Sequence, residues 1–297
     1  MASASPAPVQ VSLRPPRSER IGDVWHALRK NPTAIIGLVL VTILLLCALF
    51  PSQIAPHDPY GVDFAVESQP PSLAHPFGTD DFGQDILSRV IFGARLDLRI
   101  ALQAVFISLV AGTFLGSVSA YIGGLTDEIT MRLMDILQAF PRFIFAMGIA
   151  FALGPGITTV VIATALLNIP GYARLMRSVM LSAKASQYAA AAKAIGSPHR
   201  RILFRHLVPN CLGPIFVMST LQFGWAILEA AGLSFIGLGV EASTAEWGAM
   251  IQRGFQYYLQ GHWWMYTFPG LAIGVAVLGF NLIGDGLQDI LDPRKRS

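Results

Sequence analysis

Long apolar stretches separated by short polar segments dominate the pattern of this chain. Six stretches approach the length of a helix that crosses a bilayer: 33–50, 98–121, 131–153, 157–176, 212–236 and 265–283. Such a helix needs about 20 mostly apolar residues. The first stretch is short and ends at Pro51, and the third is interrupted by Asp135, Pro141 and Arg142. The pattern predicts an all-α polytopic membrane protein with six transmembrane helices.

The composition supports a membrane protein and argues against other classes. The 297 residues are 53% hydrophobic and 13% charged, and the mean hydropathy is +0.54. Because charged residues make up about a quarter of an ordinary soluble domain, a soluble enzyme is not expected. The high apolar content excludes a disordered chain, and two cysteines are too few for a disulfide scaffold. We expect no nucleic-acid partner.

The distribution of Lys and Arg predicts the orientation, because positive charge stays on the cytoplasmic side of a membrane. Basic residues precede the first span and end the chain, and residues 170–210 contain seven Lys or Arg but no Asp or Glu. The connection 51–97 has seven Asp or Glu against two Arg. We therefore expect both termini and the 170–210 loop in the cytoplasm, and the 51–97 loop outside the cell membrane.

Glycines spaced four apart allow helices to approach closely in lipid. Gly112 with Gly116, and Gly270 with Gly274, have this spacing and are expected to be ordinary packing faces.

Two carboxylates lie within the predicted spans, where charge is costly. Asp135 is one helical turn from Arg132 and two from Arg142, so local pairing is expected. Glu229 has no charged neighbour in its span. It fits a polar translocation path, a contact with a partner subunit or a structural role inside the bundle about equally well. We retain Glu229 as the candidate for a translocation path.

The sequence shows no convincing motif for catalysis or metal binding. The phosphate-binding loop is missing, so no ATP or other cofactor is expected in this chain. If the chain moves solute actively, the energy enters through another subunit. Asp80, Asp81 and Asp85 lack the spacing of an EF-hand and are expected to form a turn with solvated carboxylates. The six histidines show no zinc-ligand spacing. The pattern fits a transport subunit that is not itself an enzyme.

The basic loop 170–210 contains the most informative local pattern. Ser186 is expected to cap a helix over 187–195, which Gly196 ends. Ser197 and Pro198 then begin a second helix that runs to about residue 207, before Pro209. The sequence predicts a helix, a glycine bend and a second helix at the membrane surface.

The predicted bend has an alanine surface at 189–192 surrounded by positive charge. Methyl side chains let another surface come close, and His199, Arg200, Arg201 and Arg205 follow the bend. We interpret it as a docking element. The alternative is a basic amphipathic helix that lies on anionic lipid.

The same loop resembles a motif of ABC importer permeases. Tyr188-Ala189-Ala190-Ala191-Ala192-Lys193-Ala194-Ile195-Gly196, with Ile202 and Pro209, is similar to the E-A-A-x3-G-x9-I-x-L-P pattern of that family. Ala190 replaces the glutamate, and Val208 replaces the leucine. The resemblance implies a coupling helix that inserts into a groove of the ATPase. The candidate coupling residues are Tyr188, Ala190, Ala191, Ala192, Lys193, Gly196, Arg200, Arg201, Arg205 and Pro209.

Other motifs narrow the resemblance to the second permease of dipeptide and oligopeptide importers. They include His75-Pro76-Phe77-Gly78-Thr79-Asp80, Gly93-Ala94-Arg95 and Leu291-Asp292-Pro293. The resemblance covers nearly the whole chain after Asn31 and implies the type I ABC importer permease fold, also called MetI-like. It divides the chain into a cytoplasmic leader 1–30, a first helix with its outer loop 31–97, and a permease core 98–297.

The resemblance also implies a function and partners. The chain would be the permease subunit of an ATP-driven importer of dipeptides or oligopeptides. Its partners would be a homologous second permease, two cytoplasmic ABC ATPases, an extracytoplasmic peptide-binding protein and membrane lipid. Nickel or glutathione is an alternative cargo, because relatives with those cargoes share the motifs. A self-sufficient secondary carrier is a second alternative, although no convincing internal repeat supports it.

Overall fold

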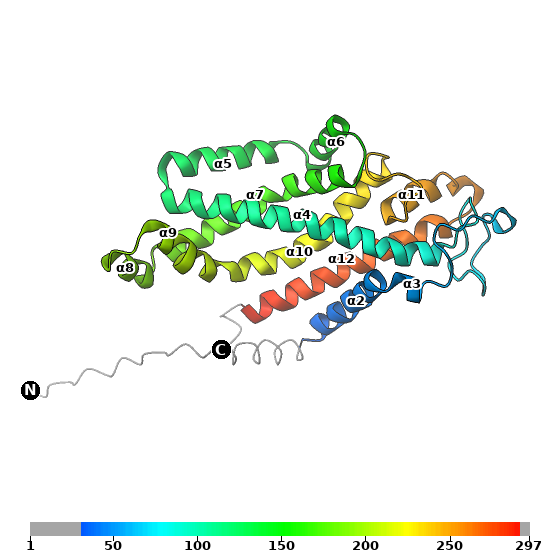
Figure 1. Cartoon of the computed structure of the whole chain (residues 1–297), viewed down its shortest axis with the longest axis horizontal. Helices are drawn as coiled ribbons and strands as arrows, with labels where there is room; N and C mark the ends of the chain where they lie inside the picture. The colour runs from blue at the N-terminus through cyan, green and yellow to red at the C-terminus, as the bar shows by residue number, and fades with distance from the viewer. Residues whose placement is uncertain (1–30, 292–297) are drawn as a thin grey trace, which may run out of the picture.

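The computed structural model describes residues 31–291 as an elongated bundle of helices (Figure 1). The long helices are α2 (Pro32–Leu49), α4 (Ile86–Ile122), α7 (Ile157–Lys184), α10 (Val208–Phe235) and α12 (Trp264–Leu291). Between α4 and α7 lie α5 (Gly124–Ala139) and α6 (Arg142–Leu153). The short elements are α3 (Pro51–Ile54), η1 (Phe64–Val66), α8 (Gln187–Ala194), α9 (His199–Arg201), η2 (Ile202–Leu207), α11 (Trp247–Phe255) and η3 (Tyr258–Gln260). No strand occurs within residues 31–291, which agrees with the all-α prediction.

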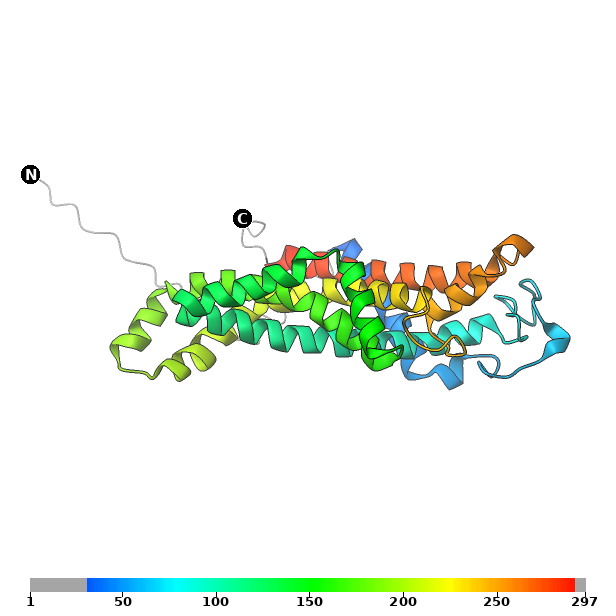
Figure 2. The same cartoon turned by 90° about the horizontal axis from the view of Figure 1, so that it is seen from above.

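The two tips of the bundle differ in structure (Figures 1 and 2). We call one tip the α8 end, because it carries α8 and α9. The opposite tip, the loop end, carries the connection 55–85. The predicted leader 1–30 lies outside the described residues.

Five helices are long and apolar enough to cross a membrane, namely Pro32–Leu49, Ile86–Ile122, Ile157–Lys184, His199–Phe235 and Trp264–Asp289. A sixth crossing exists only if α5 and α6 form one broken span, since they meet at 90°. The sequence predicted one transmembrane helix over 131–153. This prediction is wrong, because two helices, α5 and α6, share that stretch. Phe140 is extended (φ −86°, ψ 143°), because the ring of the following Pro141 disfavours helical backbone at the preceding residue.

The outward-facing sides of the long helices are apolar. On α2, Ile36 and Val39 are 53% and 51% exposed, and on α4 Phe106 is 63% exposed. Contiguous apolar surface of this extent is unfavourable in water and normal against lipid tails. The distribution of exposed side chains therefore supports the multi-pass membrane assignment.

Side-chain caps determine where two of the long helices begin. Asn31 caps α2: its side-chain oxygen accepts a hydrogen bond from Thr33 N (3.1 Å), and Pro32 is the first residue of the helix. Asp85 Oδ2 accepts from Ser88 N (2.8 Å) at the start of α4. Because this cap lies well before residue 98, α4 is longer than the apolar stretch 98–121 predicts. The predicted domain boundary between residues 97 and 98 thus falls inside a helix.

A folded polar core at the loop end replaces the expected solvated turn. Asp80 Oδ1 accepts from the N–H groups of Phe82 and Gln84, both at 2.9 Å. Arg89 is only 1% exposed, and its Nε lies 3.7 Å from Asp80 Oδ2. Burial raises the pKa of the Asp80 carboxyl above its ordinary value, an effect that the Arg89 guanidinium opposes. The expectation of solvated carboxylates is wrong.

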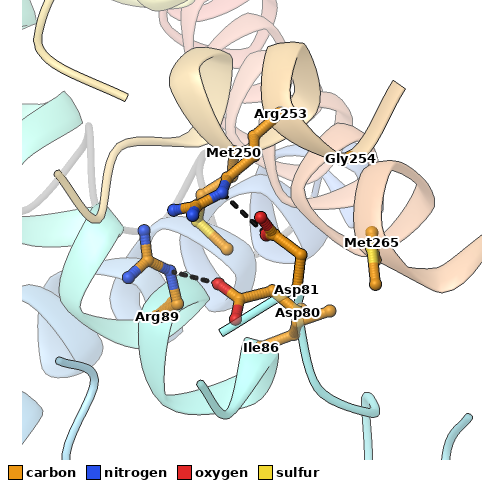
Figure 3. Close-up of a pocket in the computed structure, with 8 residues that line it drawn as sticks. All are labelled: Asp80, Asp81, Ile86, Arg89, Met250, Arg253, Gly254 and Met265. Atoms are coloured by element: carbon orange, nitrogen blue, oxygen red, sulfur yellow. Dashed lines mark ion pairs between the residues drawn. The ribbon is translucent and has the colours of Figure 1, made fainter. Parts of the chain in front are cut away.

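A second ion pair joins the loop end to α11. Arg253 Nε lies 2.7 Å from Asp81 Oδ1, and Tyr257 Oη donates to Asp81 Oδ2 at 3.1 Å. Figure 3 shows the two ion pairs facing one another. The cavity that they line has a volume of about 10 Å³. A cavity of this size has room for about one water at most. The junction therefore connects α4 with α11 and is not a ligand pocket.

Glycines hold α4 and α7 in close contact, as the predicted packing face requires. A Cβ at Gly116 would lie 2.2 Å from Ala173 O, and a Cβ at Gly112 would lie 2.5 Å from Tyr172 Cβ. The second predicted face differs: a Cβ at Gly274 would meet nothing within 4 Å among the described residues, and one at Gly270 only Ile251 Cδ1 at 4.0 Å. Within the described chain, only the first pair packs helix against helix.

We predict that Gly116→Ala destabilises the protein whereas Gly274→Ala does not. Both changes replace a helical glycine and gain about 1 kcal/mol of helix propensity. At position 116 the added methyl must separate α4 from α7, and such overpacking costs about 1–3 kcal/mol. Thermal unfolding of the purified protein in detergent should show a lower midpoint for Gly116→Ala alone. Equal midpoints for the two variants would contradict the close-contact role of Gly116.

Candidate functional site

The predicted helix and bend of the basic loop are present at the α8 end. Helix α8 runs from Gln187 to Ala194, and Gly196 follows with φ +72°. Gly196 N donates to Lys193 O (3.0 Å), and Ser197 N donates to Ala192 O (3.1 Å). This pair of bonds is the Schellman motif, which favours glycine at the left-handed position. Ser186 precedes α8, but its hydroxyl donates to Ala183 O (2.6 Å) instead of capping the helix.

The second predicted helix does not stop before Pro209. Helix α9 passes into the π-helical turn η2 and then directly into α10, so one continuous helix covers His199–Phe235. In the wide π turn, Val208 N donates to Leu203 O, five residues back. Pro209 follows in the first turn of α10, where the altered hydrogen-bond register of the π turn accommodates the missing N–H. The expected helix end is therefore a local widening.

The alanines of α8 are divided between two environments. Ala189 and Ala192 are 0% and 8% exposed and pack in the apolar cluster that contains Met176, Met180 and Ile202. Ala192, a predicted coupling residue, therefore packs within this chain. The remaining predicted coupling residues are exposed: Tyr188, Ala190, Ala191, Lys193, Gly196, Arg200, Arg201, Arg205 and Pro209. Ile195, which is 81% exposed, lies beside them. We call Tyr188, Ala190, Ala191, Lys193 and Ile195 the α8 face.

The bend is fixed to the end of α4. Lys184 Nζ donates to Tyr121 O at 2.6 Å and to Ala120 O at 3.3 Å, so a cation meets the free carbonyls of the last turn of α4. Tyr121 Oη and His199 Nδ1 lie 2.8 Å apart. These contacts hold both sides of the bend against one helix end, which makes the α8 end a rigid projection.

Glu229 lies in a polar cluster made by three helices. Arg142, the first residue of α6, donates through Nε to Glu229 Oε1 at 3.0 Å and forms an ion pair with it. Asn168 of α7 donates through Nδ2 to Glu229 Oε2 at 3.2 Å, and it accepts from Arg142 at 2.9 Å. Glu229 has no charged neighbour in its own span, as the sequence indicated, and its charged partner Arg142 belongs to another span.

The expected local pairing of Asp135 is also wrong. Asp135 Oδ1 pairs with Arg174 of α7 at 2.7 Å, and the side chains are 54% and 45% exposed. Arg142 is committed to Glu229 instead. The helix break at Pro141 turns α6 away from α5, so sequence spacing from Asp135 does not describe where Arg142 lies.

The Glu229 cluster borders an open cavity of about 350 Å³. Half of the Arg142 side chain is exposed, whereas 13% of the Glu229 side chain is. The other lining residues are Phe143, Ala146, Leu167, Trp225, Leu228 and Gly232. The site therefore combines an apolar wall with one charged pair at its edge.

The comparisons with known proteins identify the family. Residues 110–297 match the family described as binding-protein-dependent transport system inner membrane component. The chain belongs to this family. Residues 20–71 also match the N-terminal transmembrane domain of oligopeptide transport permease C. The resemblance drawn from the sequence motifs is confirmed.

Similar proteins cover nearly the whole chain. The dipeptide transport system permease protein DppC of Alkalihalophilus pseudofirmus is 43% identical, covering 93% of this chain and 90% of that protein. The probable D,D-dipeptide transport system permease protein DdpC of Escherichia coli is 40% identical, covering 95% of each. The di/tripeptide transport system permease protein DppC of Pseudomonas aeruginosa is 40% identical, covering 93% and 92%.

A solved structure supports the fold. The chain is similar to a chain of the inward-facing MetNI methionine ABC transporter, with a TM-score of 0.56 and 17% identity. The match covers 70% of this chain and 98% of the other. The predicted MetI-like permease fold is thus confirmed.

Sequence reasoning missed the partners of Glu229. Arg142 directly follows Pro141 in an otherwise apolar stretch, and Asn168 lies in the next span. A charge at membrane depth nearly always has a partner inside the protein. A search for an opposite charge in a different span would have included Arg142 among its candidates, together with Arg132 and Arg174.

We predict strong energetic coupling between Arg142 and Glu229. Removing either charge leaves the other unpaired, so Arg142→Gln and Glu229→Gln should each destabilise the protein, and the double variant should lose less than their sum. Contacting residues in one network give coupling energies of about 0.5–3 kcal/mol, and we expect about 1 kcal/mol or more. Equilibrium unfolding in detergent micelles gives the free energy of unfolding of the wild type, the two single variants and the double variant.

The exposed pair of Arg174 and Asp135 provides the control cycle, with Arg174→Gln and Asp135→Asn. Solvent screening limits exposed pairs to about 0.2–1 kcal/mol, so this coupling should be the smaller one. Equal coupling energies at the two pairs would contradict a buried structural role for the Glu229 cluster.

Proposed function

We propose that this chain is a transmembrane permease subunit of an ATP-driven importer that moves dipeptides or oligopeptides across the cell membrane. Sequence identity to permeases named for peptide cargo carries this proposal. The identity is 40–43% over more than nine tenths of the chain. Those names do not support nickel or glutathione as the cargo.

The α8 face is the proposed docking surface for a cytoplasmic ABC ATPase. Its small Ala190 and Ala191 side chains are exposed and allow close approach, while Tyr188 and Ile195 offer apolar area. Exposed Arg200, Arg201 and Arg205 add positive charge around it. The alternative of a helix lying on lipid is less favoured, because the tip projects beyond the bundle in both views (Figures 1 and 2).

This assignment sets the orientation and the partners. The α8 end lies in the cytoplasm, the side on which the basic residues also place both termini, and the loop end faces the extracytoplasmic binding protein. The chain works with a homologous second permease and with two ATPase subunits, which bind ATP and Mg²⁺. It catalyses no covalent step itself.

The Glu229 cluster is the proposed polar point on the translocation path. Broken helices at membrane depth are tolerated where they line a cavity or are buried in protein, and the break between α5 and α6 brings Arg142 to the edge of the 350 Å³ cavity. A peptide carries a charge at each end, so a wall with one cation and one carboxylate can interact with either terminus. The second permease is expected to cover this cavity.

We predict that Gly196→Val abolishes coupling, whereas Gly196→Asn retains most of it. The left-handed backbone at φ +72° is costly for a β-branched residue and tolerable for asparagine. The complex is reconstituted in liposomes with the second permease, both ATPases and the binding protein. ATP-dependent uptake of a radiolabelled dipeptide should fall at least about tenfold for Gly196→Val, with normal membrane insertion and continuing ATP hydrolysis.

Wild-type uptake by Gly196→Val would contradict the coupling role of the bend. Transport by the purified chain alone in liposomes would instead support the secondary carrier. Cargo is tested separately, by competing the labelled dipeptide with unlabelled peptides, glutathione and Ni²⁺. Competition by glutathione or Ni²⁺ but not by peptides would overturn the cargo assignment.

A further inference from the structure

Two histidines and a carboxylate from separate parts of the sequence meet at the loop end. His75 Nδ1 lies 2.9 Å from Asp85 Oδ1, and His57 Nδ1 lies 3.7 Å from the same oxygen. The two imidazole rings are 4.7 Å apart between centroids. One ligand atom from each residue can be chosen so that all three lie within 4.8 Å of one another. The sequence spacing gave no sign of this cluster, because folding of the connection brings its members together.

The carboxylate is held in a fixed position. Asp85 Oδ2 accepts from Ser88 N (2.8 Å) and from Ser88 Oγ (2.7 Å) as it caps α4. The same Oγ accepts from His57 N at 3.0 Å, which ties the His57 backbone to the cap. Oδ1 therefore remains available toward the two rings. Hydrogen bonds that orient a ligating carboxylate in this way are typical of metal sites.

The separations suit coordination of one ion. Zinc-to-nitrogen and zinc-to-oxygen bonds of about 2.0–2.2 Å in a tetrahedron place neighbouring ligand atoms about 3.3–3.5 Å apart. The separation between His75 Nδ1 and Asp85 Oδ1 (2.9 Å) is shorter than this range, and the separation between His57 Nδ1 and Asp85 Oδ1 (3.7 Å) is slightly longer. Shifts of a few tenths of an ångström in the two rings would bring both nitrogen-to-oxygen separations into this range, and the two imidazole nitrogens, which lie within 4.8 Å of each other, would approach on binding the ion. His57 is 43% exposed at the side chain, so its ring has room to move and solvent can reach the site.

We propose that His57, His75 and Asp85 form a binding site for a divalent transition-metal ion of the Zn²⁺ or Ni²⁺ class. Two imidazole nitrogens and one carboxylate oxygen prefer these ions to Mg²⁺ or Ca²⁺, which favour oxygen ligands. The ion replaces the hydrogen bond between His75 Nδ1 and Asp85 Oδ1, and water completes its coordination. The charge of the ion is partly balanced by the Asp85 carboxylate.

A bound ion would link three segments of the loop end. His57 follows α3, His75 lies in the connection 55–85, and Asp85 caps the start of α4. Because the ion binds the folded arrangement and not separated segments, it raises the stability of this end. The proposal does not depend on peptide as the cargo or on ATPase docking.

The test measures metal binding by the full chain, purified in detergent. The chain is purified through an affinity tag that contains no histidine, because a histidine tag would itself bind metal. Titration calorimetry with ZnCl₂ should show one ion per chain, and the unfolding midpoint should rise with ZnCl₂. His57→Ala removes an exposed ligand and leaves the hydrogen bond between His75 and Asp85 in place. It should weaken Zn²⁺ binding at least about tenfold, since even indirect supports of a metal site contribute about 10–100-fold.

His206→Ala, at the opposite tip of the bundle, is the matched control and should bind Zn²⁺ like the wild type. MgCl₂ is titrated in parallel and should give no saturable binding. The proposal is overturned if ZnCl₂ does not bind, if His57→Ala binds it as tightly as the wild type, or if Mg²⁺ binds equally well. Each variant's unfolding curve without metal shows whether it is folded, so a loss of binding is not mistaken for misfolding.

Discussion

A charge placed at membrane depth must find its partner inside the protein, and this constraint organises the centre of the bundle. Glu229 on α10 meets Arg142 on α6 and Asn168 on α7. Lipid tails cannot replace these contacts, so Glu229 depends on partners supplied by α6 and α7. The break at Pro141 serves the same constraint, because it turns α6 so that its first residue reaches α10. One polar cluster thus determines how three helices are placed.

Buried charges also shape the loop end, where the surroundings are protein and not lipid. Arg89 is almost fully buried and donates to Pro59 O (3.1 Å) and Ser243 O (3.2 Å). Arg89 therefore ties the connection 55–85 and the segment between α10 and α11 to the start of α4. The Asp81–Arg253 pair adds α11 to the same assembly. Hydrogen bonds to buried charged groups therefore help to fix the conformation of these loops.

The sequence was informative wherever one segment determines its own structure. Apolar length located five spanning helices, and Gly196 located the bend because a left-handed helix end favours glycine. The partners of Asp135, Glu229 and Asp85 could not be obtained this way, because each lies on a different helix or loop and depends on how the helices pack. Ala192 shows the same limit within a motif. Its residue type fits docking, but the face of α8 on which it lies makes it part of the core.

The two proposed working parts are joined by continuous helices. Helix α7 contributes Asn168 to the Glu229 cluster and ends at Lys184, beside α8. The helix that begins at His199 carries Glu229 further along. A rigid-body displacement of α8 would therefore reach the cluster through two helices that flank the same bend. Helix α6, which carries Arg142, is a separate helix that packs against α7 and α10. Because packed helices shift as units more readily than they bend, such a displacement would alter the Arg142–Glu229 pairing. In the proposed importer, this is how docking at one tip can act on the cavity in the middle of the bundle.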